Sequence, residues 1–292
     1  MDKLILTIIL LLAYVNSDAQ YAYFGTRGKI AFDKITFTKA RVRNMTQNAD
    51  PNMMMRFGGG GFNLDNMPES STQKLILHFD ENSTLLTLDP NAEADNPSSG
   101  NQIRVTGRGG NMGSRGGNFG GNQGRGNNSN MPRGRVNNGS KVFFQDLKKQ
   151  TSVVQLEIDE KYSITDSLND ITWRFTDEYR DIAGFECRRV NGATSDSLYL
   201  VAFYTDQIPV SAGPALSCGL PGMILGLAIP EMHIQYWATK VDYTNDSTPN
   251  DWKDKKANSL SFDEFVKNFG RIFQRGRDSN TGRRQIQEQL IY

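Results

Sequence analysis

Side chains that commonly carry out chemistry are scarce in this chain. It has two histidines, His78 and His233, and two cysteines, Cys187 and Cys218. A zinc site needs three or four ligands at suitable spacing, which these residues do not supply. The sequence has no Gly-x-Ser-x-Gly motif, and Cys187 has no histidine partner beyond those two, so nucleophilic catalysis is unsupported. We therefore expect a protein that is not an enzyme and that uses no cofactor.

The two cysteines favour a disulfide if the protein works outside the cytoplasm. Cys187 and Cys218 lie on segments that the sequence predicts to be neighbouring strands. Closing that loop would stabilise the fold by roughly 3.5 kcal/mol in the chain-entropy description. The alternative is a pair of buried free thiols.

Methionine is unevenly distributed, with seven of the ten between Met45 and Met131. Thioethers are soft ligands that bind Cu(I). The candidate copper ligands are Met45, Met53, Met54, Met55 and Met67. The Met-x-x-Met spacing of copper loops is missing, so gap filling by these flexible side chains is the alternative.

The N-terminus predicts export. Lys3 precedes an apolar run from Leu4 to Val15, and Ser17-Asp18-Ala19 presents small residues to a signal peptidase. The run is too short for a membrane anchor, because about 20 residues are needed to span ~30 Å of hydrocarbon. We expect a signal peptide over residues 1–19 and a mature protein that begins at Gln20. The expected location is the periplasm, with the cell exterior as the alternative, and no later segment is apolar enough to span a membrane.

Short alternating segments predict the fold. Ile30 and Phe32, then Ile35 and Phe37, alternate with polar residues on either side of a slip at Asp33-Lys34. Residues 74–88 form a hairpin pattern, and further strands are expected from residue 141 onward. One helix is expected at 262–273, with Ser261 and Glu264 as a capping box. About ten strands and one helix predict an all-β or β-rich α+β fold, a curved antiparallel sheet or partly open barrel.

Residues 91–140 interrupt these strands with Gly, Asn, Arg and Ser, and residues 96–145 contain no acidic residue. Such a segment buries too little apolar surface to offset its ordering entropy, so we expect a disordered insertion. It lies inside one domain, formed by residues 20–90 and 141–275, and residues 276–292 form a flexible tail. The insertion is similar to RNA-binding RGG tracts, but an exported protein of net charge +1 rarely meets RNA, so we expect no nucleic-acid partner.

Three segments carry a family resemblance: WRFTDEYRDIAGFECRRV (173–190), YLVAFYTDQIPVSAGP (199–214) and CGLPGMILGL (218–227). Together they resemble the GLPGLI family of exported proteins from Gram-negative bacteria. The motif stands here as 219–224, with Met223 in place of leucine, a volume-conserving change. The resemblance covers residues 141–245 strongly and 21–45 weakly. It implies a fold like that of periplasmic lipoprotein carriers and an association with TonB-dependent outer-membrane receptors. It implies no catalytic residue.

The proline and glycine residues of the motif predict a tight turn. Proline fixes φ near −65°, and glycine supplies a positive φ at the next position, as a type II turn demands. A tight structural connection is one interpretation. The other is a rigid rim loop that binds a partner, with these candidate residues: Tyr204, Ile208, Pro209, Gly213, Pro214, Gly219, Leu220, Pro221 and Gly222.

We therefore expect a non-enzymatic periplasmic binding protein that serves outer-membrane transport or envelope biogenesis, with an envelope protein such as a TonB-dependent receptor as its partner. Two alternatives remain open. One is a carrier of a lipid or a lipidated protein, argued from the carrier-like fold. The other is a copper-binding envelope protein that uses the methionines named above.

Overall fold

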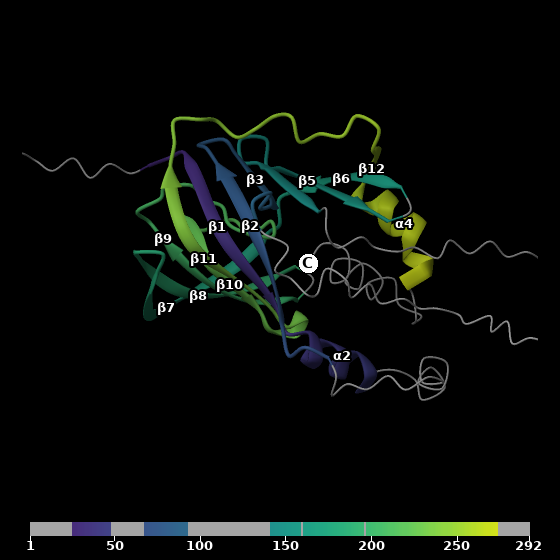
Figure 1. Cartoon of the computed structure of the whole chain (residues 1–292), viewed down its shortest axis with the longest axis horizontal. Coiled ribbons are helices and arrows are strands. Elements are labelled where there is room, and N and C mark those ends of the chain that lie inside the picture. The colour runs from purple at the N-terminus through teal and green to yellow at the C-terminus, as the bar shows by residue number, and fades with distance from the viewer. Residues whose placement is uncertain (1–24, 48–66, 93–140, 159, 196, 274–292) are drawn as a thin grey trace, which may run out of the picture.

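The alternating segments form a single curved sheet in the computed structural model, which describes residues 25–47, 67–92, 141–158, 160–195 and 197–273 (Figure 1). The strands are β1 (Gly28–Thr36), β2 (Ser71–Phe79), β3 (Ser83–Leu88), β4 (Val142–Asp146), β5 (Thr151–Glu157), β6 (Lys161–Ser167), β7 (Ile171–Ile182), β8 (Phe185–Thr194), β9 (Tyr199–Thr205), β10 (Met223–Ile229), β11 (Ile234–Tyr243) and β12 (Asn258–Ser261). The predicted signal peptide, residues 93–140 of the predicted insertion and the predicted tail lie outside the described residues.

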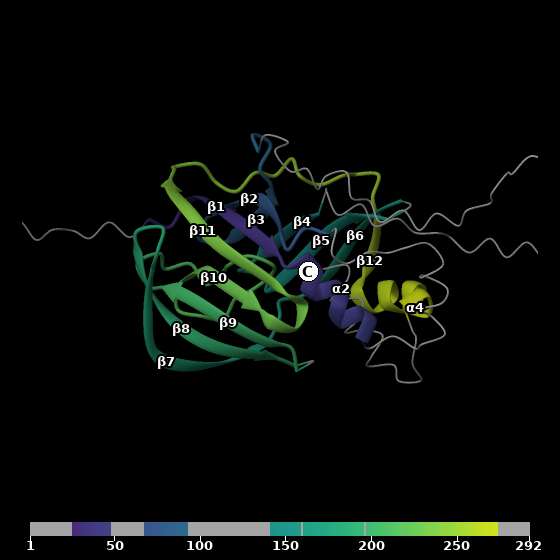
Figure 2. The same ribbon diagram turned by 60° about the horizontal axis from the view of Figure 1, so that its bottom comes forward.

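The sheet has twelve strands in the order β12-β6-β5-β4-β3-β2-β1-β11-β10-β9-β8-β7. Every neighbouring pair is antiparallel except β12 with β6. The sheet does not close, so β12 and β7 are its edges, and the predicted β-rich fold with a partly open sheet is confirmed. Figure 2 shows how it curves, with β7–β10 on one side of β1 and β4–β6 on the other. β3 and β4 pair directly although residues 93–140 separate them in the sequence.

The hairpin connections follow the sequence. β2 and β3 turn at 80–82, as the pattern predicts, and β10 joins β11 through the short 3₁₀ helix η2 (Pro230–Met232). The sequence pattern indicated a slip or bulge in this strand, and one is present, but not at Asp33-Lys34. β1 pairs with β2 in one unbroken register, and the irregularity lies in its pairing with β11, between Ala31 and Phe32. Lys34 therefore stays on the same face as Phe32.

One face of the sheet carries the hydrophobic core, and we call it the inner face. A single cluster of buried side chains joins strands from both halves, among them Ile164 of β6, Phe32 of β1 and Val190 of β8. β10, MILGLAI, is buried along almost its whole length because it is central and apolar on both faces. β7 is the opposite case, since its polar sequence leaves most side chains exposed at the sheet edge.

Two α-helices accompany the sheet in the described part of the chain. α4 (Phe262–Phe273) confirms the predicted helix: the Ser261 hydroxyl accepts from the Glu264 N–H at 3.3 Å, and the Glu264 carboxylate accepts from the Ser261 N–H at 2.9 Å. Phe265 of α4 is fully buried and packs edge-on against Tyr162 of β6. α2 (Thr38–Gln47) was not expected from the sequence. The alternation ends at residue 37, and the segment TKARVRNMTQ contains good helix formers.

Residues 244–257, which we call the strap, run from β11 along the outside of the sheet to β12 (Figure 1). The Thr248 N–H donates to the Asp80 carboxylate at 2.9 Å, and Trp252 stacks on Phe144 with ring centroids 4.7 Å apart. These contacts fix the strap across β3 and β4, so that β12 can join the sheet edge beside β6. No helix in the described ranges is long and apolar enough to cross a bilayer.

Candidate functional site

The motif loop lies between β9 and β10, and most of it is buried. Of the nine predicted binding residues, Pro209, Gly219 and Pro221 are exposed. The other six are buried: Tyr204, Ile208, Gly213, Pro214, Leu220 and Gly222. These buried side chains contribute to the core, so the arrangement favours the structural interpretation of the motif. Its role in partner binding stays a prediction, restricted to the three exposed residues.

Backbone hydrogen bonds fold this loop against the start of β10. The Met223 N–H donates to the carbonyl of Ile208 at 3.0 Å, and the Ile224 N–H donates to that of Ala212 at 2.8 Å. A loop that packs inside must satisfy its own polar groups, and these bonds do so. The loop thus packs against the start of β10 and contributes to the core.

The structural reasons for the glycines of the motif loop differ from those that the sequence predicted. A type II turn would give Gly222 a positive φ, but in the motif only Gly219 has one, at 88°. Gly222 is needed for space, since a Cβ there would overlap the backbone carbonyl of Thr205. Gly213 is similar, because its Cβ would lie 2.6 Å from that of Ile224. The type II assignment is therefore wrong, and close backbone packing is the physical reason for these two glycines.

An exposed aromatic pair lies on the edge strand β7. Phe175 is 48% exposed and Tyr179 is 56% exposed. The Arg188 guanidinium lies 5.5 Å from the ring centroid of Phe175 and 5.9 Å from that of Tyr179. Tyr204, one of the predicted binding residues, packs edge-on against Phe175 at 6.1 Å. We call Phe175, Tyr179 and Arg188 the β7 surface.

The backbone of β7 holds Arg188 in place. The pairing of β7 with β8 shifts between Phe175 and Tyr179, which produces a bulge. Within that bulge the Thr176 carbonyl accepts from Arg188 Nε at 2.6 Å, and the Asp177 carboxylate lies 3.1 Å from its guanidinium. An arginine fixed between two exposed aromatic rings is typical of protein-binding hot spots. β7 is also an edge strand, whose backbone can pair with another chain.

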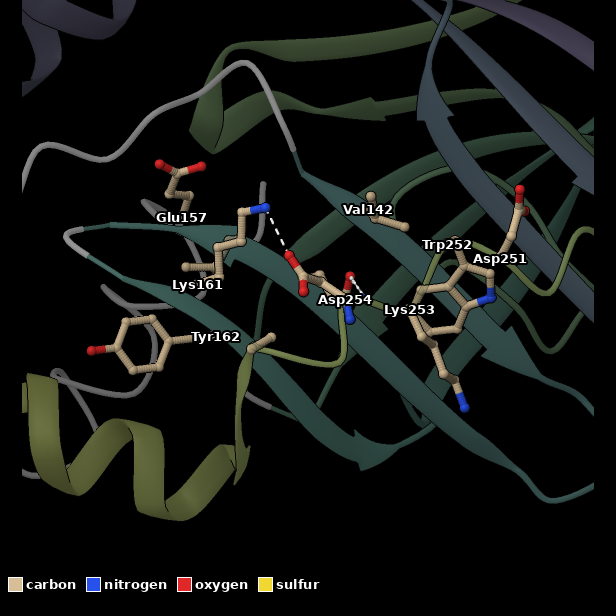
Figure 3. A pocket seen from close by; sticks show the side chains of 11 residues that line it. Val142, Glu157, Lys161, Tyr162, Asp251, Trp252, Lys253 and Asp254 are labelled. Carbon is tan, nitrogen blue, oxygen red and sulfur yellow. Dashed lines mark hydrogen bonds and ion pairs between the residues drawn. The ribbon is translucent and has the colours of Figure 1, made fainter.

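A pocket lies between the strap and β4–β6 (Figure 3). This pocket of about 420 Å³ is lined by Val142, Trp252 and Glu157 among others. Lys161 and Asp254 form an ion pair across it at 2.7 Å, so that the hydrogen bond raises the pKa of Lys161 and lowers the pKa of Asp254. These two charges satisfy each other, and their ion pair links the strap to β6.

The expected disulfide is absent: Cys187 and Cys218 are both buried free thiols. Cys187 pairs with Arg180 near one end of β7, whereas the Cys218 thiol contacts the Asn169 carbonyl at the other end. These positions are separated by roughly 30 Å of extended strand, far beyond disulfide reach. Burial raises the pKa of Cys187 to about 12 and that of Cys218 to about 11, so both are poor nucleophiles.

The metal-binding candidates do not converge in the described part of the chain. His78 of β2 lies opposite Lys29 at the start of β1. His233 lies near the other end of β1, where its backbone carbonyl accepts from the Phe37 N–H. The described residues contain no group of three His, Cys, Asp or Glu suited to a metal ion.

The predicted copper ligands fall mostly outside the description. Met53, Met54 and Met55 lie outside the described residues, and only the backbone of Met45 in α2 is described. Met67 is half-buried ahead of β2. The copper site stays a prediction.

In comparisons with known proteins, one family model matches the region around the motif loop, and it assigns no activity. A family model described as a protein of unknown function (Porph_ging) matches residues 190–226, which run from β8 through the motif loop into β10. A comparison with curated protein sequences finds no match.

A comparison with solved structures finds weak matches, among them two protein chains. They are described as PNGF-II in the P21 and C2 space groups, with 11% and 12% identity and TM-scores of 0.44 and 0.42. The matches cover 83% and 80% of this chain but only 32% and 30% of those chains. The chain thus spans about a third of the length of those chains.

Proposed function

We propose that this chain is an exported, non-enzymatic binding protein of the GLPGLI family, which docks an envelope protein through its β7 surface. The observation that carries the proposal is the exposed pair Phe175 and Tyr179, held on either side of Arg188 at a free sheet edge. Aromatic and arginine side chains are enriched where protein interfaces concentrate their binding energy. The signal peptide that the sequence predicts over residues 1–19 supports a periplasmic location.

The partner that the family resemblance favours is a TonB-dependent outer-membrane receptor. An extended segment of such a partner would add to β7 through backbone hydrogen bonds, and its side chains would pack on Phe175 and Tyr179. The Asp177 and Glu178 carboxylates beside this surface already pair with Arg188 at 3.1 Å and with Arg189 at 2.6 Å, so the docked strand would meet balanced charge there.

Capture from native cell envelopes tests this function. Tagged protein beginning at Gln20 should retain a stoichiometric outer-membrane receptor, identified by mass spectrometry. The double variant Phe175→Ala/Tyr179→Ala should lose it, whereas Tyr243→Ala, which removes a 40% exposed ring elsewhere, should keep it. Equal capture by all three proteins, or capture of no envelope protein by any of them, would refute the proposal.

A further inference from the structure

A buried glutamine lines the pocket between the strap and β4–β6. Gln155 of β5 is only 9% exposed, and its side-chain oxygen accepts from the Asp254 N–H of the strap at 3.4 Å. Its NH2 group donates to no other residue in the described part of the chain. Because buried amide groups are nearly always hydrogen-bonded, these two donors are available to a molecule in the pocket.

Trp252 of the strap contributes apolar surface and a further donor. Its ring stacks on Phe144 with centroids 4.7 Å apart, which fixes the indole on the outside of β4. The ammonium of Lys253, an exposed side chain, lies 5.3 Å from the centroid of the same ring. The indole N–H makes no hydrogen bond to any described residue. An indole in this position gives a ligand both an apolar contact and one directed hydrogen bond.

Two carboxylates of the pocket are available as acceptors. Glu157 of β5 and Asp251 of the strap line it, and neither forms a hydrogen bond or a salt bridge with a residue that the structure describes. Glu157 attracts Lys161 only at longer range, since the Lys161 ammonium pairs with Asp254 at 2.7 Å. Figure 3 shows this ion pair between Glu157 on one side and Asp251 on the other. The pocket therefore holds unused acceptors on both sides of a neutralised pair.

The charges around the pocket favour a neutral ligand. Carboxylates and ammonium groups both line it: Glu157, Asp251, Asp254, Lys161 and Lys253. An anion or a cation would therefore approach groups of its own sign. A purely apolar ligand would remove these charges from water without replacing their hydrogen bonds. A hydroxyl group avoids both costs, because it is neutral and both donates and accepts hydrogen bonds.

We propose that this pocket binds a neutral saccharide. Its hydroxyl groups would donate to the carboxylates of Glu157 and Asp251 and accept from the NH2 group of Gln155. The C–H groups of a sugar ring would contact the Trp252 indole. The volume of about 420 Å³ lies within the range of about 300–1,000 Å³ typical of small-molecule sites. β7 is the opposite edge of the sheet, so this site does not depend on the function proposed for the β7 surface.

Calorimetric titration of the protein beginning at Gln20 with trisaccharides of different charge tests the site. The neutral probes are maltotriose, cellotriose and triacetylchitotriose. The charged probes are anionic trigalacturonate and deacetylated chitotriose, which is cationic. At least one neutral probe should bind with a stoichiometry of one, and both charged probes at least about tenfold more weakly. A charged probe that binds as tightly would overturn the neutral-ligand assignment. The site itself would be overturned if no neutral probe bound with a Kd below about 1 mM.

Matched variants locate the binding. Trp252→Phe removes the indole N–H but keeps a ring on Phe144, and Glu157→Gln removes the charge but keeps the side-chain shape. Each should weaken binding of the neutral probe by about fivefold or more. Glu160→Gln, which alters an exposed carboxylate of the same hairpin outside the pocket, should bind like the parent. Unchanged affinity in both Trp252→Phe and Glu157→Gln would overturn the proposal.

Discussion

Trp173 donates its indole N–H to the backbone carbonyl of Cys218 at 3.0 Å. This bond joins β7 to the motif loop, although 45 positions separate the two residues in the sequence. The same indole lies 3.4 Å from the position of a Cβ on Gly219, so the loop passes closely beneath the ring. Two of the segments that carry the family resemblance therefore form one structural unit, in which β7 supports the loop.

Trp173→Phe should destabilise the protein by about 1–2 kcal/mol, because it leaves the Cys218 carbonyl without its donor in a buried setting. Urea unfolding followed by circular dichroism measures the change. Trp237→Phe is the matched control: that indole donates to the Gln235 side chain, so its loss should cost about 0.5 kcal/mol or less beyond packing. Equal losses of unfolding free energy in the two variants would show that the hydrogen bond to the Cys218 carbonyl does not add to stability.

Gly222→Ala should destabilise the fold by about 3 kcal/mol, since the added methyl overlaps the Thr205 carbonyl and the backbone must move. Gly184→Ala is the comparison, because Gly184 has a φ of 85° but no heavy atom within 4 Å of an added Cβ. Its cost should be only the conformational penalty, about 1 kcal/mol. Thermal unfolding distinguishes the two, and a larger loss for Gly184→Ala would contradict the packing explanation.

Much of the fold could be predicted from the sequence because alternation and capping are local signals. The hairpin at 80–82 and the capping box of Ser261 and Glu264 depend only on neighbouring residues, and both are confirmed. α2 was missed because most of its ten residues are polar and because it follows a strand pattern without an apolar stripe. Its position depends on packing at the end of β1, which no local pattern encodes.

The candidate sites could be predicted less well, because they depend on which strands become neighbours. The sequence pattern placed an irregularity of β1 at Asp33-Lys34, whereas it lies between Ala31 and Phe32 and only in the pairing with β11. The β7 surface gave no signal, because Phe175 reads as a core residue until β7 is known to be an edge strand.

Cys187 and Cys218 should remain reduced thiols under oxidising conditions, because β7 holds them at its opposite ends. At pH 8 the folded protein should react slowly with iodoacetamide, since burial raises the pKa of both thiols above 10. Addition of urea should expose both cysteines and give two alkylations by mass spectrometry. An intramolecular disulfide in the protein isolated from cells would contradict the observed arrangement.

Asp80 links the β2–β3 turn to the strap, and its charge should make stability depend on acid. Burial by itself raises the pKa of Asp80, but hydrogen bonds from Thr248, Asn82 and Ser83 outweigh burial and lower that pKa below 3.8. The unfolded state therefore takes up a proton first as the pH falls. The stabilisation by Asp80 should be complete well above pH 3.8 and disappear as the pH falls through the lowered pKa.

Asp80→Asn should accordingly lower the free energy of unfolding by about 2 kcal/mol at pH 7, since charge-assisted hydrogen bonds to the turn and the strap become neutral or are lost. The difference from the parent should shrink below pH 4, as measured by urea unfolding at several pH values. Asp242→Asn, which removes an exposed carboxylate paired with Lys240, should cost about 0.5 kcal/mol or less at any pH. If the loss caused by Asp80→Asn were the same at pH 3 and pH 7, the side chain would stabilise the strap through its shape and not its charge.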